Sequence, residues 1–186
     1  MMEHLFYTTF SSPFDDFTIV WKESASTIQI QRVFLSEQTK KSESKASEVF
    51  NQIERKVNGR INSIGEKFQR FYNGEEVTFD LDLLDFGRCS EIQKKVLLAE
   101  HKIPRGWIST YKRIAIEIGI PNGARVVGNC LAKNPFPIFI PCHRAIKSNG
   151  ELGGYQGGLD MKRVLLEQEG VKFTKNDKVI MEKIYY

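Results

Sequence analysis

The sequence contains few cysteines and no long apolar run. There are 3 cysteines among its 186 residues, and their wide spacing does not suit the disulfide framework of a small secreted domain. No stretch approaches the roughly 18 consecutive apolar residues of a membrane-spanning helix. The first ten residues, MMEHLFYTTF, lack the basic start and apolar core of a secretory signal. These absences predict no membrane partner and a cytoplasmic protein, or a nuclear one in a eukaryote.

The sequence also lacks the spacing of a metal site. No Cys-x-x-Cys pair occurs, and the histidines His4, His101 and His143 do not stand at the intervals of metal ligands. We therefore expect no metal and no other cofactor. What remains is a thiol next to a histidine, at Cys142 and His143, and in a reducing compartment such a pair is a candidate nucleophile with its base.

Charge is divided unevenly along the chain. Residues 1–86 contain 10 basic and 14 acidic residues, a net charge of −4, whereas residues 87–186 contain 17 and 9, a net charge of +8. A positive half favours a polyanionic partner such as nucleic acid, although a basic domain without such a partner has the same composition. The switch in charge coincides with residues 84–87, where we place a domain boundary.

The first half is predicted to be a small α/β scaffold domain, residues 1–86. Three short segments rich in β-branched and aromatic residues predict strands separated by turns. Helices and one more strand are expected after a polar loop. The expected elements are strands at 4–10, 17–22 and 27–35, a loop at 35–45, helices at 47–57 and 64–72, and a strand at 76–83. No pattern in this half indicates chemistry.

The second half, residues 87–186, is predicted to be mainly helical, so that the fold is α+β overall. Ser90 is a suitable cap for the first helix. Two shorter helices, at 111–118 and 124–133, are separated by a glycine-containing turn, and a last helix is expected at 159–168. Helix, tight turn and helix is the outline of a helix-turn-helix, although many helical hairpins share it without binding DNA.

Cys142 is the candidate nucleophile. A thiol reacts as its thiolate, and with a pKa of about 8.5 only a few per cent is ionised at neutral pH. His143 is the candidate base, acting directly or through a water, because Pro141 favours a bend at this point. Glu169, at the end of the last predicted helix, is the candidate group that orients the imidazole. On adjacency alone, a Cys-His pair is more often incidental than catalytic.

Other residues are candidates for contacts with DNA. Arg125 begins the second helix of the predicted helix-turn-helix, where the alternatives are insertion into DNA, a phosphate contact or a plain surface position. Ala124 and Gly128 are small enough to let that helix approach DNA closely. Tyr111 suits a core position on spacing alone, and the glycines of residues 153–158 suit either a loop against a flat ligand or an ordinary turn.

Together these segments resemble the O6-alkylguanine-DNA alkyltransferases, also called methylated-DNA–protein-cysteine methyltransferases. The acceptor motif of that family, Ile-Pro-Cys-His-Arg, stands at 140–144, and five further blocks occur in the family's order and at similar spacing. These blocks are residues 109–111, 124–128, 133–135, 153–158 and 166–170. The resemblance covers about residues 89–171; little of residues 1–86 matches, where the family usually has a small α/β domain.

The resemblance implies roles for the residues around the thiol. Cys142 is the alkyl acceptor, His143 draws off its proton through a water, and Glu169 orients His143. Asn134 looks like the residue that braces the site between the recognition helix and the active-site loop. Tyr111 resembles the tyrosine that crowds the neighbouring phosphate to promote base flipping and hydrogen-bonds the base.

Further implied roles concern the flipped base and its pocket. Arg125 resembles the arginine that fills the space left in the DNA. Tyr155 and Gln156 resemble the lid over the guanine, although many members have a serine in place of the glutamine, a change that would alter the width of the pocket. Ala145 matches a position whose backbone carbonyl reads the base, and Lys162 matches a lysine near the pocket.

The implied function is DNA repair by direct damage reversal. A methyl or larger alkyl group would pass irreversibly, once per molecule, from O6-alkylguanine in double-stranded DNA to Cys142, with the protein acting as a monomer. The first alternative is an alkyltransferase-like lesion-binding protein, which lacks the acceptor cysteine. A different Cys-His enzyme such as a hydrolase would leave Arg125 unexplained, and a transcription regulator would have no use for the acceptor motif.

Overall fold

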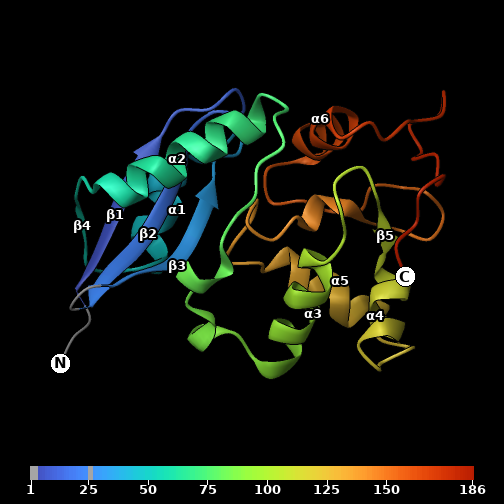
Figure 1. Cartoon of the computed structure of the whole chain (residues 1–186), viewed down its shortest axis with the longest axis horizontal. Helices are drawn as coiled ribbons and strands as arrows, with labels where there is room; N and C mark the ends of the chain where they lie inside the picture. The colour runs from blue at the N-terminus through green and yellow to red at the C-terminus, as the bar shows by residue number, and fades with distance from the viewer. Residues whose placement is uncertain (1–3, 25–26) are drawn as a thin grey trace. The chain divides into compact units, whose positions relative to one another are not determined.

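The computed structural model describes residues 4–24 and 27–186, and its fold is α+β (Figure 1). The chain forms two compact units. The first is built from Met1–Arg88 with Pro135–Pro137, and the second from Cys89–Asn134 with Ile138–Tyr186. Among the described residues, no helix combines the length and the apolar composition needed to cross a membrane.

The first unit is a four-stranded sheet with a helix on each face. The strand order is β3-β2-β1-β4, in which the first three strands pair antiparallel and β4 pairs parallel with β1. The elements are β1 (Leu5–Phe10), β2 (Phe17–Ser24), β3 (Thr27–Leu35), α1 (Ser42–Val49), β4 (Ile53–Arg55) and α2 (Gly59–Tyr72). Strands β1 to β3 confirm the predicted strands, and α2 confirms the helix predicted at 64–72 but begins five residues earlier, at Gly59.

The first five residues of β2, residues 17–21, are buried on both faces of the sheet, and four of them are apolar. Val20 packs with Ala46 of α1 in one core cluster. On the other face, the ring of Phe17 stacks on Phe68 of α2, with 5.0 Å between ring centroids. Because successive side chains of a strand point to opposite faces, each helix contacts alternate residues of β2.

The segment between β3 and α2 differs from its prediction. Residues 42–45, expected in a loop, begin α1, and residues 53–55, expected in a helix, form β4. Helix α1 has little apolar character of its own. It is held by its packing, since Ala46 is buried and the hydroxyl groups of Ser42 and Thr18 lie 2.9 Å apart. Tertiary contacts of this kind override local propensity.

The predicted strand at 76–83 is also wrong. Residues Leu81–Leu83 form a short 3-10 helix, and the preceding segment pairs with no strand among the described residues. Its apolar residues pack individually: the ring of Phe79 lies 5.1 Å from that of Phe68, edge to face. The alternating apolar residues of this segment do not form a strand of the sheet. They belong to an irregular segment that packs against α2.

The second unit is mainly helical. Its elements are α3 (Glu91–His101), β5 (Ser109–Thr110), α4 (Tyr111–Glu117), α5 (Ala124–Ala132), the 3-10 helix η3 (Cys142–Arg144), β6 (Ala145–Ile146) and α6 (Leu159–Gln168). The four α-helices confirm the predicted helices within one or two residues. The predicted cap of α3 is present, because Ser90 Oγ accepts from the amide of Gln93. Thr110 caps α4 in the same way, since its Oγ1 accepts from the amide of Arg113.

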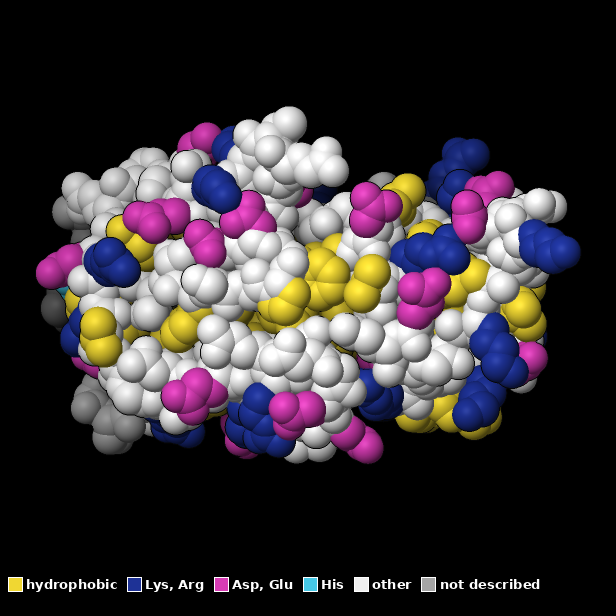
Figure 2. Space-filling view, turned by 90° about the horizontal axis from the view of Figure 1, so that it is seen from above, with side chains coloured by type: hydrophobic (Ala, Val, Ile, Leu, Met, Phe, Trp, Pro, Cys, Tyr) yellow, Lys and Arg dark blue, Asp and Glu magenta, His cyan; other side chains and the backbone are white. Residues whose placement is uncertain are grey.

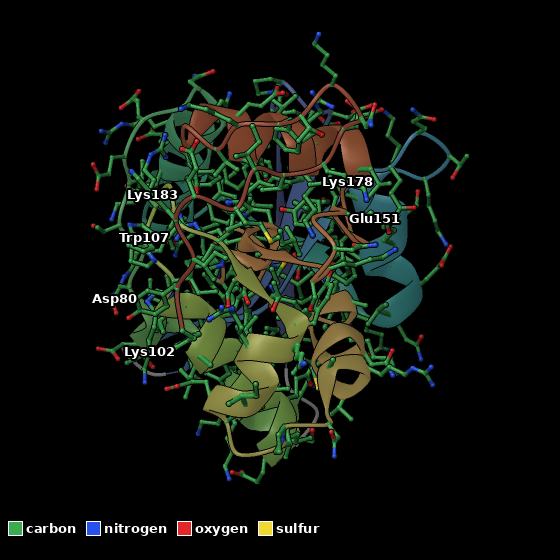
Figure 3. All side chains as sticks on the ribbon, turned by 90° about the vertical axis from the view of Figure 1, so that its right-hand side faces the viewer. Asp80, Lys102, Trp107, Glu151, Lys178 and Lys183 are labelled. Atoms are coloured by element: carbon green, nitrogen blue, oxygen red, sulfur yellow. The ribbon has the colours of Figure 1, made fainter. Side chains whose placement is uncertain are left out.

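Two irregular segments complete the second unit around β5 and β6, which pair parallel. Residues 138–140 turn at Ile138, which has a φ of 75°, and lead into η3. The C-terminal segment returns beside β5. The amide of Ile108 donates to the carbonyl of Lys183, and Trp107 and Lys183 are neighbours in Figure 3.

Candidate active site

Cys142 lies at the start of η3 and is buried, with 5% of its surface exposed. Asn134, which follows α5 and is fully buried, donates from Nδ2 to Cys142 Sγ at 3.2 Å and to the carbonyl of Ile140 at 3.3 Å. Burial raises the pKa of the Cys142 thiol to about 12, although the hydrogen bond from Asn134 lowers it. The resting side chain is therefore a thiol at neutral pH, and its reaction requires a base.

His143 is held by a buried carboxylate. Its Nε2 lies 2.9 Å from Oε1 of Glu169, the residue that caps the end of α6. Because a carboxylate only accepts, this pairing places a hydrogen on Nε2 and makes Nδ1 the basic nitrogen of the neutral ring. Burial lowers the pKa of His143, and the charge of Glu169 opposes that shift. The ring is thus neutral and able to accept a proton at physiological pH.

Arg144 secures the same carboxylate from a second direction. Its Nε donates to Glu169 Oε2 at 2.9 Å and its Nη2 donates to Oε1 at 2.8 Å, a bidentate arrangement. Burial alone would raise the pKa of Glu169, but the charges and hydrogen bonds of His143 and Arg144 hold it well below its usual range. Glu169 therefore stays ionised and keeps the imidazole in one orientation.

Lys162 connects β6 to the glycine-rich loop that precedes α6. Its side chain is fully buried, and Nζ donates to the carbonyls of Ala145 at 2.7 Å, Leu152 at 2.6 Å and Gly154 at 3.4 Å. Burial lowers the pKa of this lysine to about 8. The three acceptors match the three donors of an ammonium group, so Lys162 fixes the loop most firmly in its charged form.

A groove of about 530 Å³ lies beside α4 and α5. Tyr111 forms part of its wall and packs against Gly153, which has a φ of +69°. A Cβ at this glycine would lie 2.5 Å from the Tyr111 hydroxyl, so only glycine fits there. The residues that line the groove include Tyr111, Lys112, Ala124, Arg125, Gly128, Leu131, Lys147, Gly153 and Gly154.

The structure gathers the candidate residues into two groups. The buried group consists of two hydrogen-bonded pairs, Asn134 with Cys142 and His143 with Glu169, and Cys142 and His143 are neighbours in the sequence. Tyr111, Ala124, Arg125 and Gly128 line the groove, with Arg125 exposed on α5. Tyr155 and Gln156 are half-buried and contact the buried group: the ring of Tyr155 lies 6.3 Å from that of His143, and Gln156 Nε2 donates to the carbonyl of Asn134 at 2.7 Å.

Sequence reasoning missed two charged residues at this site. Arg144 belongs to the motif that singled out the thiol, but its sequence position does not show that it binds Glu169. Glu100 is fully buried on α3, and burial raises its pKa to about 8, while Lys162 and Arg144 lower it. The signal for Glu100 was its spacing, because it stands with Val96 and Leu97 on the buried face of α3.

Comparison with protein families, with other proteins and with solved structures adds four findings. Residues 91–171 match the family model for the DNA-binding domain of 6-O-methylguanine DNA methyltransferase. The methylated-DNA–protein-cysteine methyltransferase of Methanothermobacter thermautotrophicus is 47% identical over 111 residues, which are 60% of this chain and 62% of that protein. The constitutive enzyme of the same name from Bacillus subtilis is 32% identical over 171 residues, which are 91% of this chain and 98% of that protein.

A crystal structure of Mycobacterium tuberculosis OGT in complex with DNA shows a similar fold. The TM-score is 0.71 at 31% sequence identity, and the match covers 88% of this chain and 92% of that one. The chain thus spans less than two thirds of the archaeal relative's length, but nearly all of the Bacillus and mycobacterial proteins.

Proposed function

The chain belongs to the family of methylated-DNA–protein-cysteine methyltransferases, and from that premise we propose that it repairs O6-alkylguanine in double-stranded DNA by transferring the alkyl group to Cys142. The observation that carries this proposal is the buried thiol of Cys142, whose sulfur accepts a hydrogen bond from Asn134 beside the paired His143 and Glu169. The transfer is irreversible, so each molecule acts once.

Activation of the thiol is the first step. Because burial holds Cys142 in its protonated form, the proton must leave when the substrate is in place. His143 accepts that proton at Nδ1, through a water, since its Nε2 is engaged with Glu169. The ionised carboxylate stabilises the imidazolium that forms, and the Asn134 donor stabilises the thiolate.

Displacement follows at the alkyl carbon. The thiolate forms a carbon–sulfur bond while the bond from that carbon to O6 of guanine breaks. The guanine leaves as an anion that takes up a proton, and the product is a thioether on Cys142. A thioether is stable to hydrolysis, and no described residue of the site supplies a route back to the thiol. The positions of Tyr111, Ala145 and Lys162 support roles in binding the flipped base and its leaving anion.

Binding to DNA is assigned to residues 87–186, with α4 and α5 as a helix-turn-helix. Arg125, on the exposed side of α5, fills the gap left by the flipped nucleotide, and the small residues Ala124 and Gly128 permit close approach. The net charge of +8 in this half supports contact with phosphates. Basic and acidic side chains are interspersed on the face viewed in Figure 2.

Residues 1–86 serve as a scaffold domain in this proposal, because no candidate site residue lies there. The protein acts as a monomer on damaged DNA, in the cytoplasm or in the nucleus of a eukaryotic cell. No metal or cofactor takes part, since every step above is performed by side chains of residues 87–186.

The test is a single-turnover reaction with a duplex containing one O6-methylguanine. The expected result is loss of the methyl group from the DNA in a one-to-one ratio with protein, and no loss with Cys142→Ala, which still binds the duplex. Binding by the unaltered protein with the lesion left intact would overturn the proposal and favour the lesion-binding alternative.

A further inference from the structure

Gln156 connects the glycine-rich loop to the nucleophile through a chain of hydrogen bonds. Its Nε2 donates to the backbone carbonyl of Asn134 at 2.7 Å, across 22 residues of sequence. Asn134 in turn donates from its side chain to Cys142 Sγ at 3.2 Å and to the carbonyl of Ile140 at 3.3 Å. Because backbone carbonyls only accept, the amide nitrogens of both side chains must point as described.

The loop that carries Gln156 needs such an anchor. Residues 147–158 join β6 to α6 and contain five glycines, of which Gly150, Gly153 and Gly158 have positive φ. Glycine-rich backbone loses the most conformational entropy on ordering. Lys162 holds the first part of the loop at the carbonyls of Leu152 and Gly154, and the hydrogen bond of Gln156 holds the part that follows.

We propose that Gln156 is a positioning residue for the alkyl transfer: it fixes the peptide of Asn134, and thereby the amide that donates to the sulfur of Cys142. The inference rests on the proposed function and deepens it. The ordered position of the glycine-rich loop and the hydrogen bond from Asn134 to the thiol are therefore coupled. If the loop moves away, the donor on the sulfur loosens with it.

Two consequences can be measured. A donor to sulfur stabilises the thiolate, so loss of the Gln156 hydrogen bond should raise the apparent pKa of Cys142 by about half a unit to one unit. The transfer rate at saturating DNA should fall about three- to tenfold, in proportion to the smaller thiolate fraction. The fall in rate at saturating DNA is the effect that the bond to Asn134 predicts. A residue that only covered the base would change the half-saturating DNA concentration instead.

The experiment compares three variants with the unaltered chain. Gln156→Met keeps the length of the side chain without its donor, and Gln156→Glu keeps the shape but places a carboxylate against the carbonyl of Asn134. Gln52→Met makes the same change at an exposed position of the first unit and is the matched control. Should Gln156→Met not fold, as judged by thermal unfolding, Gln156→Ser takes its place.

The first readout needs no DNA. The rate of carbamidomethylation of Cys142 by iodoacetamide is followed against pH, with peptide mass analysis separating this cysteine from Cys89 and Cys130. The second readout is single-turnover methyl transfer from the O6-methylguanine duplex. Both Gln156 variants are expected to show the raised thiol pKa and the slower transfer, and Gln52→Met is expected to match the unaltered chain.

The outcomes separate the two proposals. Thiol pKa values and saturated rates equal to those of the unaltered chain would overturn the positioning role, as would a loss confined to the half-saturating DNA concentration. A raised thiol pKa in a protein that transfers no methyl group would support the connection between loop and thiol while overturning the proposed function.

Discussion

Nε2 of His143 and Oε1 of Glu169 lie 2.9 Å apart, with 0% and 1% of their side chains exposed. A histidine and a carboxylate buried together at this distance form a strong pair, because little water competes for either group. Arg144 binds the same carboxylate, so removing its charge would disturb both partners. A single substitution in this pair should therefore affect both the reaction and the stability of the site.

Glu169→Gln should slow methyl transfer by about 10–100-fold, a part of the 10²–10⁴-fold that a general base contributes. It should also lower the free energy of unfolding by about 3 kcal/mol, since Arg144 is left without its anion. Single-turnover kinetics and urea unfolding measure the two effects. Glu167→Gln, which removes an exposed carboxylate from the same helix, is the control and should change neither. A full rate in Glu169→Gln would contradict the role of the pair.

Glu100 gives a prediction about pH and stability. Burial raises its folded pKa to about 8 from an ordinary 4.5, so the folded state binds the extra proton between these values. The stability that this proton supports is fully present below pH 4.5 and is lost as the pH rises toward 8. Glu100→Gln cannot lose a proton, and it should be more stable than the unaltered chain at pH 8.5 by about 1–3 kcal/mol.

Urea unfolding at pH 4.5, 7 and 8.5 measures that difference, with Glu91→Gln on the exposed side of the same helix as the control. The advantage of Glu100→Gln should grow with pH, whereas the control should follow the unaltered chain. Stability curves that stay parallel across this range would show that Glu100 keeps an ordinary pKa in the folded protein.

Arg125→Ala tests the flipping role of α5. Repair of the methylated duplex should fall more than about tenfold, because the gap in the base stack is left unfilled. Reaction with free O6-benzylguanine, which needs no flipping, should stay within about twofold. Lys95→Ala removes an exposed cation from α3 and should affect neither substrate strongly. Equal losses on both substrates would mean that Arg125 supports the pocket itself.

Salt should weaken DNA binding steeply. Residues 87–186 carry a net charge of +8, and each phosphate contact releases counterions when it forms. Affinity for an undamaged duplex should fall at least tenfold between about 50 and 200 mM salt, and by similar factors for duplexes of different sequence. Fluorescence anisotropy measures this dependence. Affinity independent of salt would contradict binding through phosphates.

Much of the second unit could be predicted because its local signals agree with its fold. Ser90 and Thr110 cap the helices that they precede, and glycines or prolines follow the helix ends, so pattern and structure coincide. In the first unit, α1 and β4 depend on distant partners. β4 pairs with β1, which lies more than forty residues earlier in the chain, and α1 is fixed by contacts with β2. The local sequence of β4 and α1 contains no sign of either contact.

The candidate site divides in the same way. The acceptor motif drew attention to Cys142 and His143, and Glu169 was the candidate carboxylate because it stands at the end of the last predicted helix, a role that the family resemblance also implies. The bidentate contact of Arg144 and the burial of Glu100 depend on how α3, η3 and α6 meet in the fold. The sequence alone does not distinguish a buried glutamate from an exposed one, unless its position on the apolar face of a helix is taken into account.

The most direct test of the account is peptide-resolved mass spectrometry of the protein after reaction with a duplex containing O6-methylguanine. The account predicts one added methyl group per molecule, located on the peptide that contains Cys142, with Cys89 and Cys130 unmodified. A methyl group on either of those two cysteines, or unaltered protein alongside unaltered lesion, would contradict it.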